Sequence, residues 1–262
     1  NWEAAYEKTT IPMEVHHLTR EEFDHGKTRD QAARMSQADY LLFMTQDALP
    51  EDRHLIEKLV EAIEQEEKIG AAYARQLPRE DCRLMEQYTR QFNYPEKSRV
   101  KWLADLPELG IKTYFCSNVC AMYKRELYLQ LGGFVKKTIF NEDMIFAGGL
   151  IQKGYGVAYA AEAKVVHSHN YSAIQQFHRN FDLAVSQADH PEVFDGIRSE
   201  GEGIRLVKKT AGWLCRQGKP WMVIQLVWQS GWKYLGYLLG KRYQKLPKWV
   251  IPRCTMNPKY WE

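Results

Sequence analysis

Runs of apolar side chains along this 262-residue chain have lengths and spacings typical of strands and helices. Residues 40–44 form a continuous apolar run of strand length, the pattern of a parallel strand that is buried on both faces. Residues 70–77 and 115–123 predict further strands, and residues 163–169 predict a short strand with two histidines on one side. Residues 11–18 are also expected to form a strand.

Helical spacing of apolar residues predicts helices between these strands. Residues 51–68 place Leu55, Leu59 and Ile63 on one face of an amphipathic helix. Residues 172–188 predict another helix, in which Asp182 is expected to face solvent. Residues 95–112 contain Pro and Gly breakers and predict a loop over the site. The remaining expected helices cover residues 27–37, 80–94 and 124–131 and begin again at residue 142.

The composition changes near residue 200. Residues 203–262 carry twelve Lys and Arg and one acid, a formal charge of +11, whereas residues 1–202 carry −8. Six of the eight tryptophans also lie after residue 203. Residues 204–216 predict a basic helix, and residues 221–239 predict a helix with a very wide apolar face. Such a segment suits the headgroup region of a membrane, or it is an ordinary helical appendage packed on the body or on a second copy.

Three further features bound the class of protein. The five cysteines form no CxxC pair and indicate free thiols instead of a disulfide framework, although Cys116 and Cys120 remain an alternative metal pair. No apolar run is long enough to span a bilayer cleanly, and no secretory signal is visible. Residues 1–7 have helical composition.

Two adjacent acids begin the predicted helix at residue 142. Asn141 is a candidate N-cap, and Glu142 and Asp143 lie in the first turn, where the helix dipole favours negative charge. They are either helix-capping acids or functional carboxylates. With His167 and His169 at the end of a following strand, they predict a polar pocket.

Three other positions carry candidate chemistry. Asp47 follows the apolar run 40–44, and ligands of open α/β sheets gather beyond the carboxyl ends of strands. A carboxylate there can coordinate a divalent cation, or it is a surface Asp in a turn. The two histidines can flank one ion as neutral imidazoles, or one can bind a diphosphate. Gly26 and Lys27 open a helix whose free backbone N–H groups suit phosphate, or they form a solvated helix start.

These residues also carry a family resemblance. Residues 117–172 resemble the acceptor-side half of family 2 glycosyltransferases, and His-Ser-His-Asn-Tyr at 167–171 is most like the bacterial rhamnosyltransferases. Residues 22–30 are similar to the rhamnosyltransferase pattern Glu-Phe-x-His-Gly-x-Thr-Arg-Asn, with Asp30 in place of Asn. Thr45-Gln46-Asp47 stands where many such enzymes have Asp-x-Asp, a form that the rhamnosyltransferase-like branch shares.

The resemblance implies a fold and a division of the chain. We expect a GT-A-type α/β fold with a doubly wound, mostly parallel sheet, followed by a C-terminal helical appendage. The catalytic domain would cover residues 1–190 without a visible N-terminal nucleotide-binding unit, and the appendage would cover residues 200–262.

The resemblance also assigns roles. Asp143 would be the base that deprotonates the acceptor hydroxyl, and Glu142 would position it or the acceptor. The metal, Mg²⁺ or Mn²⁺, would be held by Asp47, His167 and His169. The donor nucleotide sugar would be contacted by Gly26, Lys27, Arg29, Gln46, Asp47, Ser117 and Asn118.

The implied function is inverting transfer of a sugar, by resemblance L-rhamnose from dTDP-L-rhamnose, onto a lipid-linked cell-surface glycan. The enzyme would work at the cytoplasmic membrane face, with its tail on anionic lipid. Alternatives are a transferase for another donor such as a UDP-sugar, an inactive scaffold, or a module that binds nucleic acid. We expect no nucleic-acid partner, because the tail's aromatic residues fall at helical core spacing; a homo-oligomer stays open.

Overall fold

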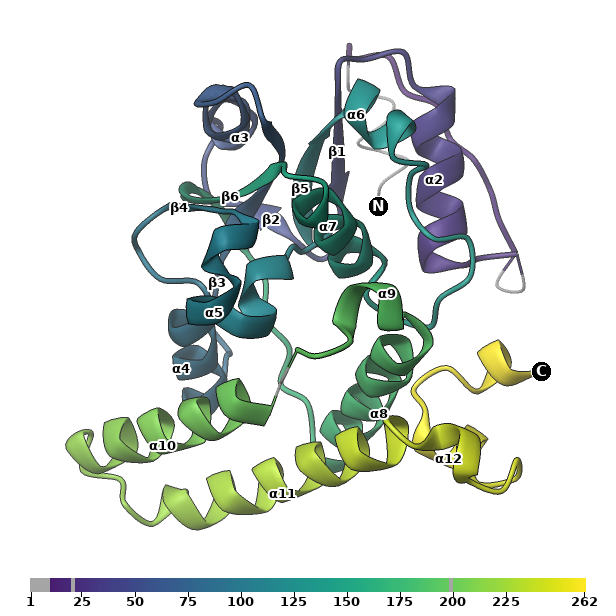
Figure 1. Cartoon of the computed structure of the whole chain (residues 1–262). Helices are drawn as coiled ribbons and strands as arrows, with labels where there is room; N and C mark the ends of the chain where they lie inside the picture. The colour runs from purple at the N-terminus through teal and green to yellow at the C-terminus, as the bar shows by residue number, and fades with distance from the viewer. Residues whose placement is uncertain (1–9, 20–21, 198–199) are drawn as a thin grey trace.

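The computed structural model describes residues 10–19, 22–197 and 200–262 of the chain (Figure 1). The strands are β1 Tyr40–Met44, β2 Leu49–Pro50, β3 Ile69–Leu77, β4 Arg99–Lys101, β5 Cys120–Lys124 and β6 Gly156–Val166. The α-helices are α2 His25–Met35, α3 Leu55–Glu64, α4 Leu84–Asn93, α5 Leu106–Leu109, α6 Arg125–Gln130, α7 Glu142–Gln152, α8 Ala173–Asp189, α9 Pro191–Phe194, α10 Glu200–Arg216, α11 Met222–Gly240 and α12 Ile251–Cys254. Short 3₁₀ helices are η1 Leu103–Asp105, η2 Gly110–Tyr114, η3 Tyr243–Lys245 and η4 Pro258–Trp261.

The strands form a mixed sheet in the order β1-β5-β3-β6-β2, and β4 also pairs with β6. Within the described residues β3 and β6 are the parallel pair, and the other pairs are antiparallel. The expectation of a mostly parallel sheet is therefore wrong for this part of the chain. The apolar run 40–44 was expected to be a buried parallel strand, yet β1 runs antiparallel to β5 and buries fully only Leu41. An apolar run reports burial, and it does not report strand direction.

Side-chain alternation along β3 separates two cores. Ala71 and Tyr73 face the core that contains α7, whereas Ala72 and Ala74 face the core under α3. Successive strand residues point to opposite faces, so one strand serves both layers. The predicted amphipathic helix is confirmed as α3, whose Leu55, Leu59 and Ile63 are buried.

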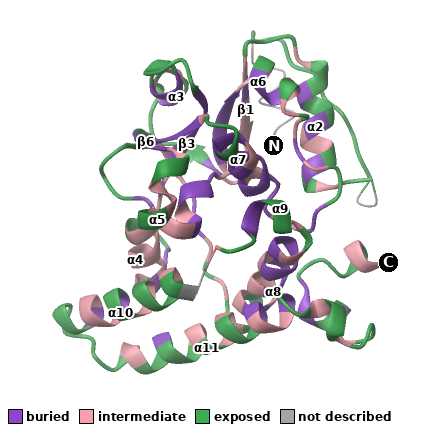
Figure 2. Ribbon diagram, viewed as in Figure 1, coloured by how far each residue is buried: buried purple, intermediate pink, exposed green. Residues whose placement is uncertain are grey.

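Helix α7 is buried on almost every side (Figure 2). Its apolar residues pack against a cluster of rings from β5 and the following segment, which includes Tyr123, Tyr128 and Phe134. This burial fixes the N-terminal turn of α7 under the sheet. Asn141 precedes that turn in the left-handed region with φ 66°, and its side chain makes no capping hydrogen bond, so the expected side-chain cap is absent.

The C-terminal helices pack on the body through α8. A Cβ at Gly236 or Gly240 of α11 would lie 2.2 Å from the Phe177 carbonyl oxygen or 2.3 Å from that of Phe181. Only glycine permits this approach of α11 to α8.

Asp182 of α8 was expected to face solvent, but it is buried and accepts a hydrogen bond from the backbone N–H of Met256 at 2.9 Å. The polar segment after α12 therefore covers the carboxylate.

Three other expectations change. Residues 11–18 form no strand; their apolar side chains are exposed and they have no strand partner among the described residues. Residues 95–112 are less of a loop than expected, because they contain β4, η1, α5 and the start of η2. The predicted helix at residues 1–7 lies outside the described residues.

Candidate active site

Asp47, His167 and His169 lie together at one edge of the sheet. A tight turn follows β1, in which the Ala48 N–H donates to the Thr45 carbonyl, and Asp47 projects from it. The histidines follow the end of β6 at Val166, so they lie just beyond the strand on which they were expected. Asp47 Oδ2 is 3.4 Å from His167 Nε2 and 3.3 Å from His169 Nε2. Their possible ligand atoms all lie within 4.8 Å of one another.

A chain of hydrogen bonds fixes the tautomer of His167. Arg90 of α4 donates to Gln76 Oε1, and an arginine can only donate, so this atom of Gln76 is the amide oxygen. The same oxygen lies 3.1 Å from His167 Nδ1, which must therefore carry the hydrogen. His167 Nε2 then presents its lone pair toward Asp47. Metal-binding histidines are commonly oriented in this way through their second nitrogen.

Burial keeps both imidazoles neutral. Burial, helped by the positive charge of Arg90, lowers the pKa of His167 to about 4, and burial also lowers the pKa of His169. At neutral pH the cluster offers two imidazole lone pairs and one carboxylate, with a net negative charge. This donor set fits a divalent cation such as Mn²⁺ or Mg²⁺.

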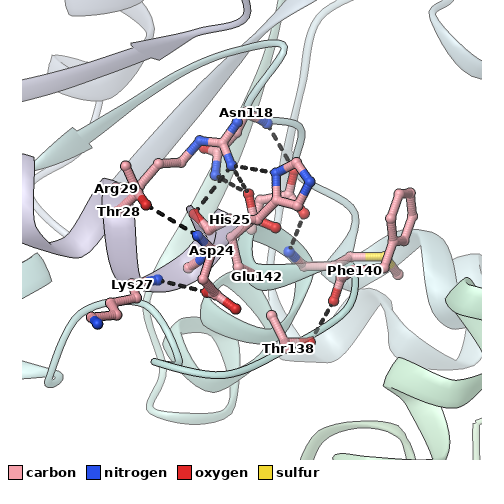
Figure 3. Close-up of polar contacts among 12 residues, drawn as sticks. Asp24, His25, Lys27, Thr28, Arg29, Asn118, Thr138, Phe140 and Glu142 are labelled. Atoms are coloured by element: carbon pink, nitrogen blue, oxygen red, sulfur yellow. Dashed lines mark hydrogen bonds and ion pairs between the residues drawn. The ribbon is translucent and has the colours of Figure 1, made fainter. Parts of the chain in front are cut away.

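Glu142 and Asp143 form a second cluster at the start of α7. Figure 3 shows Glu142 with Arg29 and Asn118. Arg29 reaches from α2 and pairs with Glu142 Oε1 at 2.8 Å. Asn118 donates to the same oxygen at 3.1 Å and accepts from the Tyr123 hydroxyl at 2.9 Å. Glu142 is therefore held on two sides and buried, which suits a positioning residue.

Asp143 is held differently. It accepts hydrogen bonds from the backbone N–H of Asn118 at 2.8 Å and from its own neighbour Met144 at 2.7 Å. Burial, followed by the adjacent Glu142 carboxylate, raises the pKa of Asp143 to about 7 despite these bonds. A carboxylate with a pKa near neutrality is suited to take a proton from a hydroxyl group.

Residues 117 and 118 join the two clusters. Gln76, which orients His167, also donates from Nε2 to Ser117 Oγ at 3.1 Å, and Asn118 contacts both acids of α7. The structure thus brings together Asp47, His167, His169, Ser117, Asn118, Glu142 and Asp143. Gln46 is exposed in the turn beside Asp47.

The start of α2 differs from the phosphate-binding expectation. Asp24 Oδ1 accepts from the N–H groups of Gly26 and Lys27, both at 2.9 Å, so these groups are not free for phosphate (Figure 3). Gly26 instead allows close packing, because a Cβ there would lie 1.9 Å from the Val135 carbonyl oxygen. The Lys27 side chain is exposed, while Arg29 turns toward Glu142.

Two arginines near the site have no pattern in the sequence that assigns them to it. Arg90 reaches the site from α4. Arg179 of α8 lies over the rings of Phe140 and Tyr171, 4.6 Å and 5.8 Å from their centroids. Its charge contributes to lowering the pKa of both histidines, and no carboxylate in the described parts of the chain forms an ion pair with it. A half-buried cation that forms no ion pair within the described residues, next to a candidate cation site, can receive an anionic group.

Comparison with known proteins gives one answer. A family model described as glycosyl transferase family 2 matches residues 3–132. The O-antigen chain rhamnosyltransferase WbaN of Salmonella anatum is 39% identical over 248 residues, which cover 93% of this chain and 78% of that protein. The O-antigen chain rhamnosyltransferase RfbN of Salmonella typhimurium is 40% identical over 253 residues, covering 95% and 79%.

A solved structure supports the architecture. The mannosyltransferase PcManGT of Pyrobaculum calidifontis, in complex with GDP-Man and Mn²⁺, aligns with a TM-score of 0.55 and 14% identity over 94% of this chain and 73% of that one. The expected GT-A-type α/β fold is thus confirmed, with a mixed sheet in place of a mostly parallel one. Identity near 40% over most of both chains also shows common descent with the rhamnosyltransferases, so this chain belongs to glycosyltransferase family 2 and is a glycosyltransferase.

Proposed function

We propose that this enzyme transfers L-rhamnose from dTDP-L-rhamnose, with inversion, onto a growing O-antigen-type glycan on a lipid carrier. The named relatives support the sugar and the glycan, because both are called O-antigen chain rhamnosyltransferases and both match over most of their length. The reaction would take place at the cytoplasmic face of the membrane.

The donor diphosphate would bind at the Asp47, His167 and His169 cluster. These residues would hold Mg²⁺ or Mn²⁺, and such an ion supplies charge neutralisation for a leaving diphosphate. Arg179 would add a second positive charge on the α8 side. Ser117, Asn118, Gln46 and the exposed side chain of Lys27 remain proposed donor contacts. Arg29 would act through Glu142, and Gly26, whose N–H is taken by Asp24, would serve the packing of α2.

Asp143 would be the base that accepts the proton of the acceptor hydroxyl as that hydroxyl attacks the anomeric carbon. The observation that carries this assignment is the short bridge between the clusters. Gln76 contacts both His167 and Ser117, and the next residue, Asn118, donates its N–H to Asp143. The base would therefore sit on one side of the sugar and the cation site on the other, as inversion requires.

The test is calorimetric titration of dTDP, UDP and GDP into wild type, Asp47→Ala and Asp143→Ala, with and without Mn²⁺. We expect metal-dependent binding that is strongest for dTDP, lost in Asp47→Ala and retained in Asp143→Ala. Transfer from dTDP-L-rhamnose to an acceptor would then be followed by mass spectrometry. Preference for UDP or GDP would overturn the donor assignment, and no nucleotide binding would overturn the donor site itself.

A further inference from the structure

Helix α11 presents an apolar stripe to solvent. Trp221, just before the helix, is 65% exposed, and Ile224 and Trp228 are 78% and 62% exposed. Val227, Tyr234 and Leu235 extend the same side of the helix, with Gly231 between them. These positions recur at spacings of three, four and seven residues, so they form one face. A surface helix usually exposes polar residues, whereas this face of α11 exposes apolar ones.

The opposite face of α11 is already committed. Gly236 and Gly240 approach the backbone of α8, and Leu226 lies in a buried cluster with Met85 and Leu214. The helix therefore cannot rotate to bury its exposed stripe without losing its packing contacts with α8. Figure 1 shows α10 and α11 as a long helical hairpin along one side of the molecule, and Figure 2 shows mostly exposed and intermediate residues along α11.

Exposed cations lie at both ends of this stripe. Arg216 and Lys219 precede α11, and Lys241 and Arg242 follow it. No ion pair joins any of the four to a carboxylate within the described residues, and residues 203–261 contain no acid. An apolar band with cations at each end is the arrangement of a helix that lies flat in a membrane interface.

Charge decides between an anionic membrane and a second copy of the chain. Two such helices facing each other across a dimer interface would place the cations of one copy against those of the other, with no acid on this segment to compensate. Anionic headgroups would neutralise them. In the described part of the chain, no helix is long and apolar enough to cross a bilayer.

We propose that α11 is a membrane-docking helix. Its stripe from Trp221 to Leu235 enters the boundary between headgroups and acyl chains, and Arg216, Lys219, Lys241 and Arg242 contact anionic lipid. The proposal rests on the surface of α11 and not on the identity of the sugar. It also supplies what an enzyme with a lipid-carried acceptor needs, a fixed orientation at the membrane.

Flotation of the full-length protein with vesicles tests the proposal. Vesicles of phosphatidylcholine alone are compared with vesicles that also contain phosphatidylglycerol. We expect binding to the anionic vesicles, a loss on the order of tenfold or more in Ile224→Asp, and a loss of about fivefold for each cation removed in Lys241→Ala and Arg242→Ala. Ile56→Asp is the matched control, because Ile56 is 58% exposed on α3, and it should bind as wild type does.

Two companion measurements keep the outcome decisive. Circular dichroism and dTDP titration show whether each variant folds, and they separate failure of docking from failure of the donor site. Sedimentation velocity reports the oligomeric state. Equal loss in Ile56→Asp and Ile224→Asp, absence of vesicle binding by wild type, or a dimer that Ile224→Asp dissociates would each overturn the proposal.

Discussion

The two halves of the active site hold their carboxylates in opposite electrostatic settings. Asp47 is partly exposed and faces two imidazoles that burial keeps neutral, so it remains an uncompensated anion. Asp143 is half-buried beside a second carboxylate, and its pKa rises to about 7. The first setting attracts a cation, whereas the second holds a proton loosely near neutral pH. The same side chain is thus suited to the two different roles proposed here because its neighbours differ.

Replacing the Asp143 carboxylate should have the largest effect on kcat. Asp143→Asn keeps the shape and one acceptor for the backbone N–H groups, but it cannot take a proton. We expect kcat to fall roughly 10²- to 10⁴-fold, with dTDP affinity nearly unchanged, measured by steady-state kinetics and calorimetry.

Asp182→Asn is the matched control for that substitution. Asp182 is buried, and burial raises its pKa to about 6 as it raises that of Asp143, but Asp182 contacts the C-terminal segment and lies outside both clusters. Its kcat should stay close to that of wild type. A comparable loss in both variants would mean that burial of an acid, and not its position on α7, explains the effect.

Removing the hydrogen bond that orients His167 should have an intermediate effect. Gln76→Leu removes the acceptor of the His167 Nδ1–H and leaves the ring free to rotate. We expect Mn²⁺ affinity to fall roughly 10- to 100-fold, measured by electron paramagnetic resonance, without a change in circular dichroism. Gln152→Leu, at an exposed position on α7, is the control. Unchanged Mn²⁺ affinity in Gln76→Leu would remove the orienting role.

The sequence predicts the separate parts of the active site better than it predicts how they meet. Apolar runs locate β1, β3 and α3, and the acids at the start of α7 and the histidines after β6 are visible in the chain. Their convergence is not visible, because Gln76, Arg90 and His167 meet only through the pairing of β3 with β6 and the packing of α4. Strand direction is hidden for the same reason, since the apolar run of β1 is equally compatible with either direction.

Local polar competition explains why the start of α2 does not offer the free N–H groups of Gly26 and Lys27 that were expected. Gly26 and Lys27 have the composition of a phosphate site, but Asp24, two residues before Gly26, is close enough in the chain for its carboxylate to accept from both N–H groups. Asp is among the preferred N-cap residues, so this neighbour was the signal that could have corrected the expectation.

The smallest effect tests whether Glu142 tunes Asp143 or only holds it. The proposed mechanism requires Asp143 without its proton, so the rate should rise as pH passes its pKa of about 7. Glu142→Gln removes a negative neighbour and leaves the positive charge of Arg29 uncompensated, and both changes lower the pKa of Asp143. The rising limb of the kcat profile should therefore move to lower pH, by up to about one unit. Glu202→Gln, which removes a glutamate paired with Lys112 and Arg205 away from α7, should leave the limb in place. A Glu142→Gln enzyme that loses kcat at every pH with an unmoved limb would show that Glu142 acts through geometry alone.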